Sequence, residues 1–146
     1  MSYIYEGVTH TDLSEGYMQA LGMDTETIES VLLQVEYERG KRSERAIQTR
    51  FDAVYEPLAT THGFIDVGRG KDGILGMDNI KDAVAAYGSG LTEVESVAWI
   101  MSDNSVATLT IADLNQIIVD FNMRKQDIFT AYGQWRAGDK QEAFTL

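Results

Sequence analysis

The sequence predicts a mainly α-helical fold: a three-helix domain with a long N-terminal helix and one small β-hairpin. Apolar residues recur at helical spacing through 25–56 and 110–137, and a shorter stretch does so at 78–87. Only residues 97–109 contain two β-type runs separated by turn residues. The chain of 146 residues has the length of one typical domain. We therefore expect a single helical domain over residues 24–138.

The long helix has a clear start and a clear end. Asp24 has the position of an N-cap, and Pro57 must end the helix because proline lacks an N–H and disfavours helical geometry in the residue before it. Unbroken from 25 to 56, the helix would be ~48 Å long, whereas a compact chain of this size has a radius of gyration of ~15 Å. The helix should therefore either break near Gly40 or project from the body. A projecting helix would need a partner chain for its apolar stripe, which begins with Ile28, Val31, Leu32 and Val35.

The segments on either side of this helix carry weaker signals. Residues 1–23 combine alternating aromatic residues with three glycines and are expected to form an extended N-terminal arm or a short strand. Five glycines within 63–76 indicate tight turns, with a small glycine-bent hairpin as an option. Asp78 offers an N-cap for a short helix that Gly88 would end.

The last third of the chain gives the strongest pattern. Residues 97–101 and 106–109 are predicted strands, and 102–105 have the composition of a turn. Thr110 and Asp113 have the spacing of a capping box for the last helix. Gly138 is a natural stop, so residues 139–146 are expected to be a loose C-terminal tail.

Composition and charge exclude several classes of function. Twelve Lys and Arg against 23 Asp and Glu give a net charge of −11, which disfavours nucleic acids and anionic membranes as partners. The absence of cysteine excludes disulfides, thiolate metal sites and thiol nucleophiles. No stretch approaches the ~20 apolar residues of a membrane span, and the N-terminus lacks the parts of a secretory signal. Synthesis in the cytoplasm in a soluble form is therefore expected.

The glycine-rich segment is a candidate anion-binding loop, because glycine exposes backbone N–H groups and two cations lie nearby. It lacks the features of a P-loop or a dinucleotide fingerprint, so a plain turn competes with this interpretation. A calcium loop starting at Asp66 would place glycines at two ligand positions, and His10 and His62 lack metal-binding spacing. We therefore expect no metal, no cofactor, no catalytic residues and no enzymatic activity. The loop candidates are Gly68, Arg69, Gly70 and Lys71.

Charge is divided unevenly along the chain. Residues 1–38 hold eight acidic and no basic residues, whereas 39–50 hold five basic residues and one acidic residue. The basic cluster is expected either to pair with an acidic segment of another subunit or to form a solvated helix face with internal pairs such as Glu38 with Arg42. Under the first interpretation, the candidate interface residues are Arg39, Lys41, Arg42, Arg45, Val31 and Val35.

Three segments carry a family resemblance. They are the arginine-bearing helix at 36–52, the run Ile74-Leu75-Gly76-Met77-Asp78-Asn79-Ile80-Lys81-Asp82-Ala83-Val84, and Trp99-Ile100-Met101-Ser102-Asp103-Asn104 followed by Leu109-Thr110 and Asp113-Leu114. Over residues 36–137 the chain resembles a loosely defined family of small bacteriophage and prophage proteins and C-terminal domains, often encoded among tail-fibre and tail-fibre-assembly genes.

The resemblance implies a role in virion structure or tail assembly within an oligomer, and it supplies no catalytic residues. The expected function is therefore that of a non-enzymatic phage or prophage structural or tail-assembly protein, acting through self-association and contacts with tail or tail-fibre proteins. Its expected location is the host bacterial cytoplasm during assembly, with the virion as a later location. The alternative is a small-ligand or anion-binding module that uses the loop at 63–76.

Overall fold

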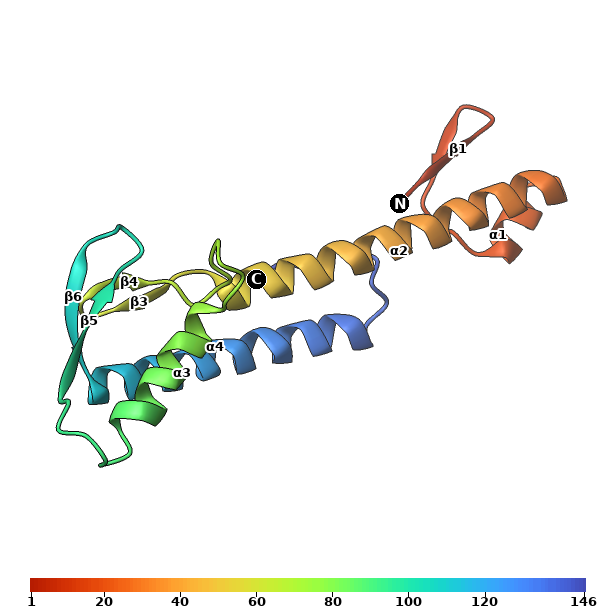
Figure 1. The fold of residues 1–146 in the computed structure, drawn as a ribbon. Coiled ribbons are helices and arrows are strands. Elements are labelled where there is room, and N and C mark those ends of the chain that lie inside the picture. Colours follow the sequence, from red (N-terminus) through yellow and green to blue (C-terminus); the bar gives the residue numbers. More distant parts are fainter. The chain divides into compact units, whose positions relative to one another are not determined.

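A computed structural model describes residues 1–146 and contains four helices and three small antiparallel hairpins (Figure 1). The expectation of three helices with one hairpin is therefore wrong: the chain is 52% helical and 16% strand. The helices are α1 (Glu15–Ala20), α2 (Thr25–Tyr55), α3 (Gly76–Tyr87) and α4 (Ile111–Ala137). The hairpins pair β1 (Tyr3–Tyr5) with β2 (Val8–His10), β3 (Leu58–Thr60) with β4 (Gly63–Ile65), and β5 (Ser96–Ile100) with β6 (Val106–Thr110).

The hairpins that the sequence did not reveal depend on tight turns. In the β1–β2 hairpin, Glu6 and Gly7 have φ angles of +49° and +80°, as a two-residue type I′ turn requires. In the β3–β4 hairpin, Gly63 has a φ of +112° that other residues rarely adopt. Each of their strands has only three residues, which is too short for a clear alternating pattern.

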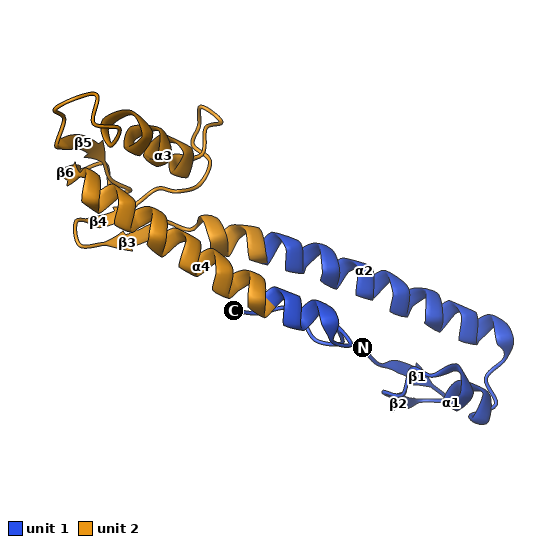
Figure 2. Ribbon diagram, turned by 90° about the horizontal axis from the view of Figure 1, so that it is seen from below, with its two compact units in different colours: residues 1–49, 132–146 blue, residues 50–131 orange.

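The chain divides into two compact units (Figure 2). Unit 1 comprises residues 1–49 and 132–146, and unit 2 comprises residues 50–131. Each unit has its own apolar cluster. In unit 1, Tyr3, Met18, Met23 and Ile28 are buried together. In unit 2, the buried cluster is Val54, Leu58, Ile65, Val67, Met77, Ile80, Met101, Leu109, Leu114, Ile117, Phe121 and Ile128.

Helix α2 is continuous through Gly40, so the break that the sequence left open does not occur. Asp24 caps the helix as expected, because its carboxylate accepts the Thr27 backbone N–H at 2.8 Å. The helix ends at Tyr55, two residues before Pro57, as the proline predicts. At 31 residues it is about 46 Å long.

The start of α3 differs from the expectation by three residues. The helix begins at Gly76, Leu75 has the N-cap position without a side-chain hydrogen bond, and Asp78 lies in the first turn. A Cβ atom on Gly76 would lie 2.2 Å from the Asp66 carbonyl oxygen, so close backbone approach requires glycine there. The expected end at Gly88 is confirmed.

The start of α4 agrees with the sequence prediction. The Thr110 backbone N–H donates to the Asp113 carboxylate at 2.8 Å, and the Asp113 backbone N–H donates to the Thr110 hydroxyl at 3.0 Å. This is the reciprocal capping box expected from the spacing. The preceding hairpin β5–β6 also lies where the strand pattern predicts it.

The C-terminal residues 139–146 are anchored within unit 1. Phe144 is buried, and its ring lies 5.6 Å from that of Tyr132 and 5.8 Å from that of Trp135. The Trp135 indole N–H also donates to the Glu142 carbonyl at 2.9 Å. No helix in the chain combines the length and the hydropathy that a membrane crossing requires.

Candidate functional site

One face of α2 in unit 1 exposes apolar side chains in a regular line. Leu33, Tyr37, Gly40, Glu44 and Ile47 are spaced alternately four and three residues apart, so they share one helix face, which we call the outer face. Leu33 is 66% exposed, Tyr37 58% and Ile47 49%. These three large side chains are therefore much more exposed to solvent than the side chains of a hydrophobic core.

The opposite face of α2 is occupied by the chain itself. Ile28 is buried in the unit 1 cluster, and Val31 packs against that cluster. Val35 is only 8% exposed. The structure therefore places Val31 and Val35, the two apolar interface candidates from sequence, in or beside intrachain packing. The sequence analysis did not select Leu33 and Tyr37 as interface candidates. Their helical spacing with Ile47 could have indicated a shared face, but Gly40 and Glu44 lie between them on that face and break the apolar pattern.

The four basic candidates on α2 differ in their contacts. Arg39 and Arg45 are exposed and form no ion pair. Lys41 Nζ lies 3.1 Å from the Glu44 carboxylate and 5.6 Å from the centre of the Tyr37 ring.

The fourth basic candidate, Arg42, is held by the C-terminal segment. Its Nε donates to the Lys140 carbonyl at 2.9 Å. The Glu38 carboxylate accepts a hydrogen bond from Gln34 instead of pairing with Arg42. The internal Glu38–Arg42 pair that the sequence offered as an alternative is therefore absent.

A groove lies beside the outer face, between α2 and the C-terminal segment of unit 1. It has a volume of about 650 Å³, and Leu33, Arg39 and Arg42 are among its lining residues. Leu32 and Val35 contribute further apolar lining, and the carboxylates of Glu29, Glu36 and Asp139 lie at the same groove. A groove with an apolar lining and charges of both signs is suited to protein side chains.

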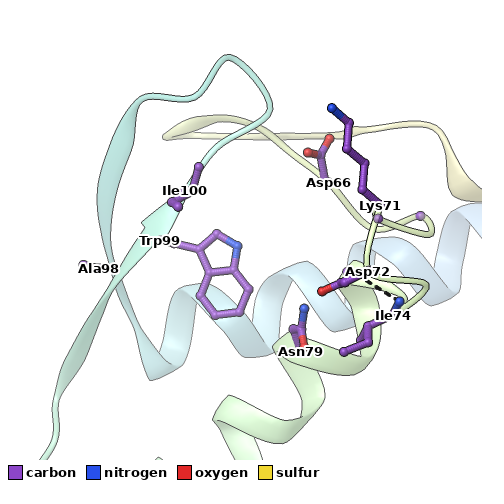
Figure 3. Close-up of a pocket in the computed structure, with 11 residues that line it drawn as sticks. Asp66, Lys71, Asp72, Ile74, Asn79, Ala98, Trp99 and Ile100 are labelled. Carbon is purple, nitrogen blue, oxygen red and sulfur yellow. Dashed lines mark hydrogen bonds between the residues drawn. The ribbon is translucent and has the colours of Figure 1, made fainter.

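The glycine-rich segment lines a second pocket, in unit 2, with a volume of about 710 Å³ (Figure 3). Gly68, Gly70 and Lys71 lie at this pocket, together with Trp99 from β5 and Asn79 from α3. The fourth loop candidate is used elsewhere: the Arg69 guanidinium donates to the Gly73 carbonyl and closes the loop. The structure thus brings three of the four loop candidates together.

The hydrogen bonds of this loop do not favour an anion. The backbone N–H groups of Gly70, Gly73 and Gly76 donate to carbonyls within the segment, at 2.9, 3.0 and 2.7 Å. The Ile74 N–H donates to the Asp72 carboxylate at 3.0 Å. A second carboxylate, that of Asp66, also lines the pocket and accepts the Ser102 hydroxyl at 2.7 Å. Two carboxylates and one ammonium group suit a neutral or cationic ligand better than an anion.

The two histidines lie in separate local contacts. His10 Nδ1 is 3.0 Å from the Tyr17 hydroxyl in unit 1, and His62 Nε2 is 3.4 Å from the Asp113 carboxylate in unit 2. The backbone N–H of Thr110 is the main cause of a lowered pKa at Asp113, and His62 adds to it. No group of three His, Asp or Glu side chains in the chain has the arrangement of a metal site.

Comparison with known proteins identifies one family. Residues 41–143, more than two thirds of the chain, match the model of a family described as "Domain of unknown function (DUF4376)". The match covers all of unit 2 and begins directly after Gly40. The hairpin β1–β2, α1 and the acidic half of α2, residues 25–38, therefore lie outside it. No curated protein and no solved structure matches the chain.

Proposed function

The chain belongs to the DUF4376 family, and we propose that it is a non-enzymatic structural or assembly protein that acts through self-association and contacts with other proteins. The observation that carries this proposal is the outer face of α2, with three large apolar side chains half to two-thirds exposed in one line. Such an exposed line is typical of a surface that another chain covers.

The free energy available from covering this face is substantial. Complete burial of a side chain such as Leu or Ile contributes about 1.5–3 kcal/mol. Leu33, Tyr37 and Ile47 keep about half to two-thirds of their surface in water, so a partner would gain a large part of that contribution at each position. At a net charge of −11, two copies repel each other at long range, so association depends on local complementarity at the contact.

The biological setting of the proposal rests on the resemblance to phage and prophage proteins encoded among tail-fibre and tail-assembly genes. On that basis the partners are tail or tail-fibre proteins and further copies of this chain. Assembly would take place in the host bacterial cytoplasm, and the assembled protein would enter the virion. The exposed outer face of α2 supports only a protein partner and does not depend on this setting.

The mass of the full chain in solution tests the proposal. We expect a mass above the monomer value of 16.3 kDa that rises with protein concentration. The series is repeated at ~1 M salt, where the Debye length is ~3 Å and the long-range repulsion between two copies is screened. A mass of 16.3 kDa at every concentration and salt level would contradict the proposal.

A charge reversal identifies the surface. Arg39→Glu with Arg45→Glu should lower the oligomer fraction, since both side chains are exposed and free of ion pairs. Lys71→Glu with Lys81→Glu is the matched control: it changes the net charge by the same amount at exposed positions of unit 2. An equal effect of both double variants would show that net charge alone controls association.

A further inference from the structure

We propose that two copies of this chain pair through the outer face of α2 in antiparallel orientation, with the two helices crossing at Gly40. This inference rests on the proposed function and adds its partner, orientation and register. Three observations support it: a glycine that its own chain does not need, a symmetric placement of apolar side chains, and a division of charge along the helix.

Gly40 lies in the middle of α2, where glycine is less favourable for helix stability than alanine. Its backbone is helical and needs no positive φ. A Cβ atom built at Gly40 would meet nothing within 4 Å, so the packing of its own chain gives no reason for glycine. Close approach of a second backbone does give a reason, because glycine has no Cβ and lets another helix come closest to the residue.

Two of the three apolar side chains of the outer face, Leu33 and Ile47, are placed symmetrically about this glycine. Leu33 and Ile47 lie seven residues before and after Gly40, about two helical turns on either side. In a twofold pair centred on Gly40, Leu33 of each copy faces Ile47 of the other. The same patch of surface therefore serves both copies, as a closed dimer requires.

Charge selects the antiparallel orientation. Residues 25–38 of α2 contain four acidic and no basic residues, whereas 39–49 contain four basic residues and one acidic residue. An antiparallel pair places each acidic half beside a basic half, and a parallel pair would place like charges together. Among residues 25–49 of α2 the ion pair is that of Lys41 with Glu44, so the acidic half has no intrachain ion pair and Arg39 and Arg45 have none either.

Two glycine-to-alanine variants test the crossing. Gly40→Ala and Gly133→Ala both replace a helical glycine whose Cβ would meet nothing within 4 Å, so both should raise the melting temperature of the dilute chain by a few degrees. Only Gly40→Ala should weaken association, by about tenfold or more in Kd. Sedimentation equilibrium over a concentration series measures this difference directly.

The outcomes separate this inference from the proposed function. If wild type associates and Gly40→Ala associates as tightly or more tightly, the crossing at Gly40 is wrong while assembly stands. Equal weakening by Gly133→Ala would also overturn the crossing. If wild type remains monomeric at every concentration, the proposed function itself fails.

Discussion

Asp24 shows how a single residue sets the start of the longest helix. Its carboxylate accepts the Thr27 backbone N–H at 2.8 Å and the Thr27 hydroxyl at 3.0 Å. The backbone hydrogen bond is the main cause of a lowered pKa at Asp24. Since the unfolded pKa of aspartate is about 3.9, the contribution of this carboxylate to stability is fully present above that pH. It is lost as the pH falls through the lower folded pKa.

The substitution Asp24→Asn separates capping from ionisation. Asparagine caps helices about as well as aspartate but does not titrate. We therefore expect stability near wild type at pH 7 and a smaller loss of stability than wild type between pH 4 and pH 2. Urea unfolding at both ends of this range measures the difference. Asp82→Asn, at an exposed aspartate of α3 outside any helix cap, is the matched control for the loss of one carboxylate.

Local residue chemistry could be predicted from the sequence, whereas contacts between distant segments could not. The cap at Asp24, the stop at Pro57 and the capping box at Thr110 each depend on neighbours within four residues. The start of α3 depends on the close approach of Gly76 to the Asp66 carbonyl, ten residues earlier. The prediction of Asp78 as the N-cap was wrong because no feature of the neighbouring sequence indicates this contact between Gly76 and Asp66.

At the level of elements, Arg124 of α4 joins two helices within unit 2. Its guanidinium donates to the Val54 carbonyl at 2.8 Å and to the Glu56 carbonyl at 2.6 Å. These carbonyls lie at the end of α2, where the helix leaves acceptors without intrahelical partners and Pro57 prevents its continuation. Arg124 therefore caps the C-terminus of α2 from another element.

Arg124→Met should remove this cap while keeping much of the apolar stem. Hydrogen bonds from a charged donor contribute about 1.5–3 kcal/mol, so we expect a loss of that order in the free energy of unfolding. The midpoint of urea denaturation measures it. Arg136→Met replaces an exposed arginine on the last turn of the same helix and should change the midpoint little; equal effects of both variants would refute the capping role.

The long helices and the hairpin β5–β6 were predictable because their patterns extend over many residues. The hairpins β1–β2 and β3–β4 were not, because each of their strands has only three residues, too few for an alternating pattern to be recognised. The helical spacing also did not reveal which side of α2 the chain covers. Val35 and Leu33 are both apolar and two residues apart, yet one is 8% and the other 66% exposed.

At the scale of the whole molecule, two apolar clusters form in two units instead of one common core. The family match extends over unit 2 and reaches only part of unit 1. The acidic half (25–38) and the basic half (39–49) of α2 both lie within unit 1, where the apolar side chains of the outer face are exposed. Charge and exposure therefore coincide in the part of the chain that we propose as the contact between copies.

Disulfide cross-linking tests this contact most directly, because the chain has no cysteine of its own. Leu33→Cys and Ile47→Cys chains, one of them mass-labelled, would be mixed under mild oxidation and the linked dimers weighed. An antiparallel pair centred on Gly40 predicts that links between the two different variants exceed links between like variants. Dominant links between two Leu33→Cys chains, or no enrichment of the mixed dimer, would contradict the account.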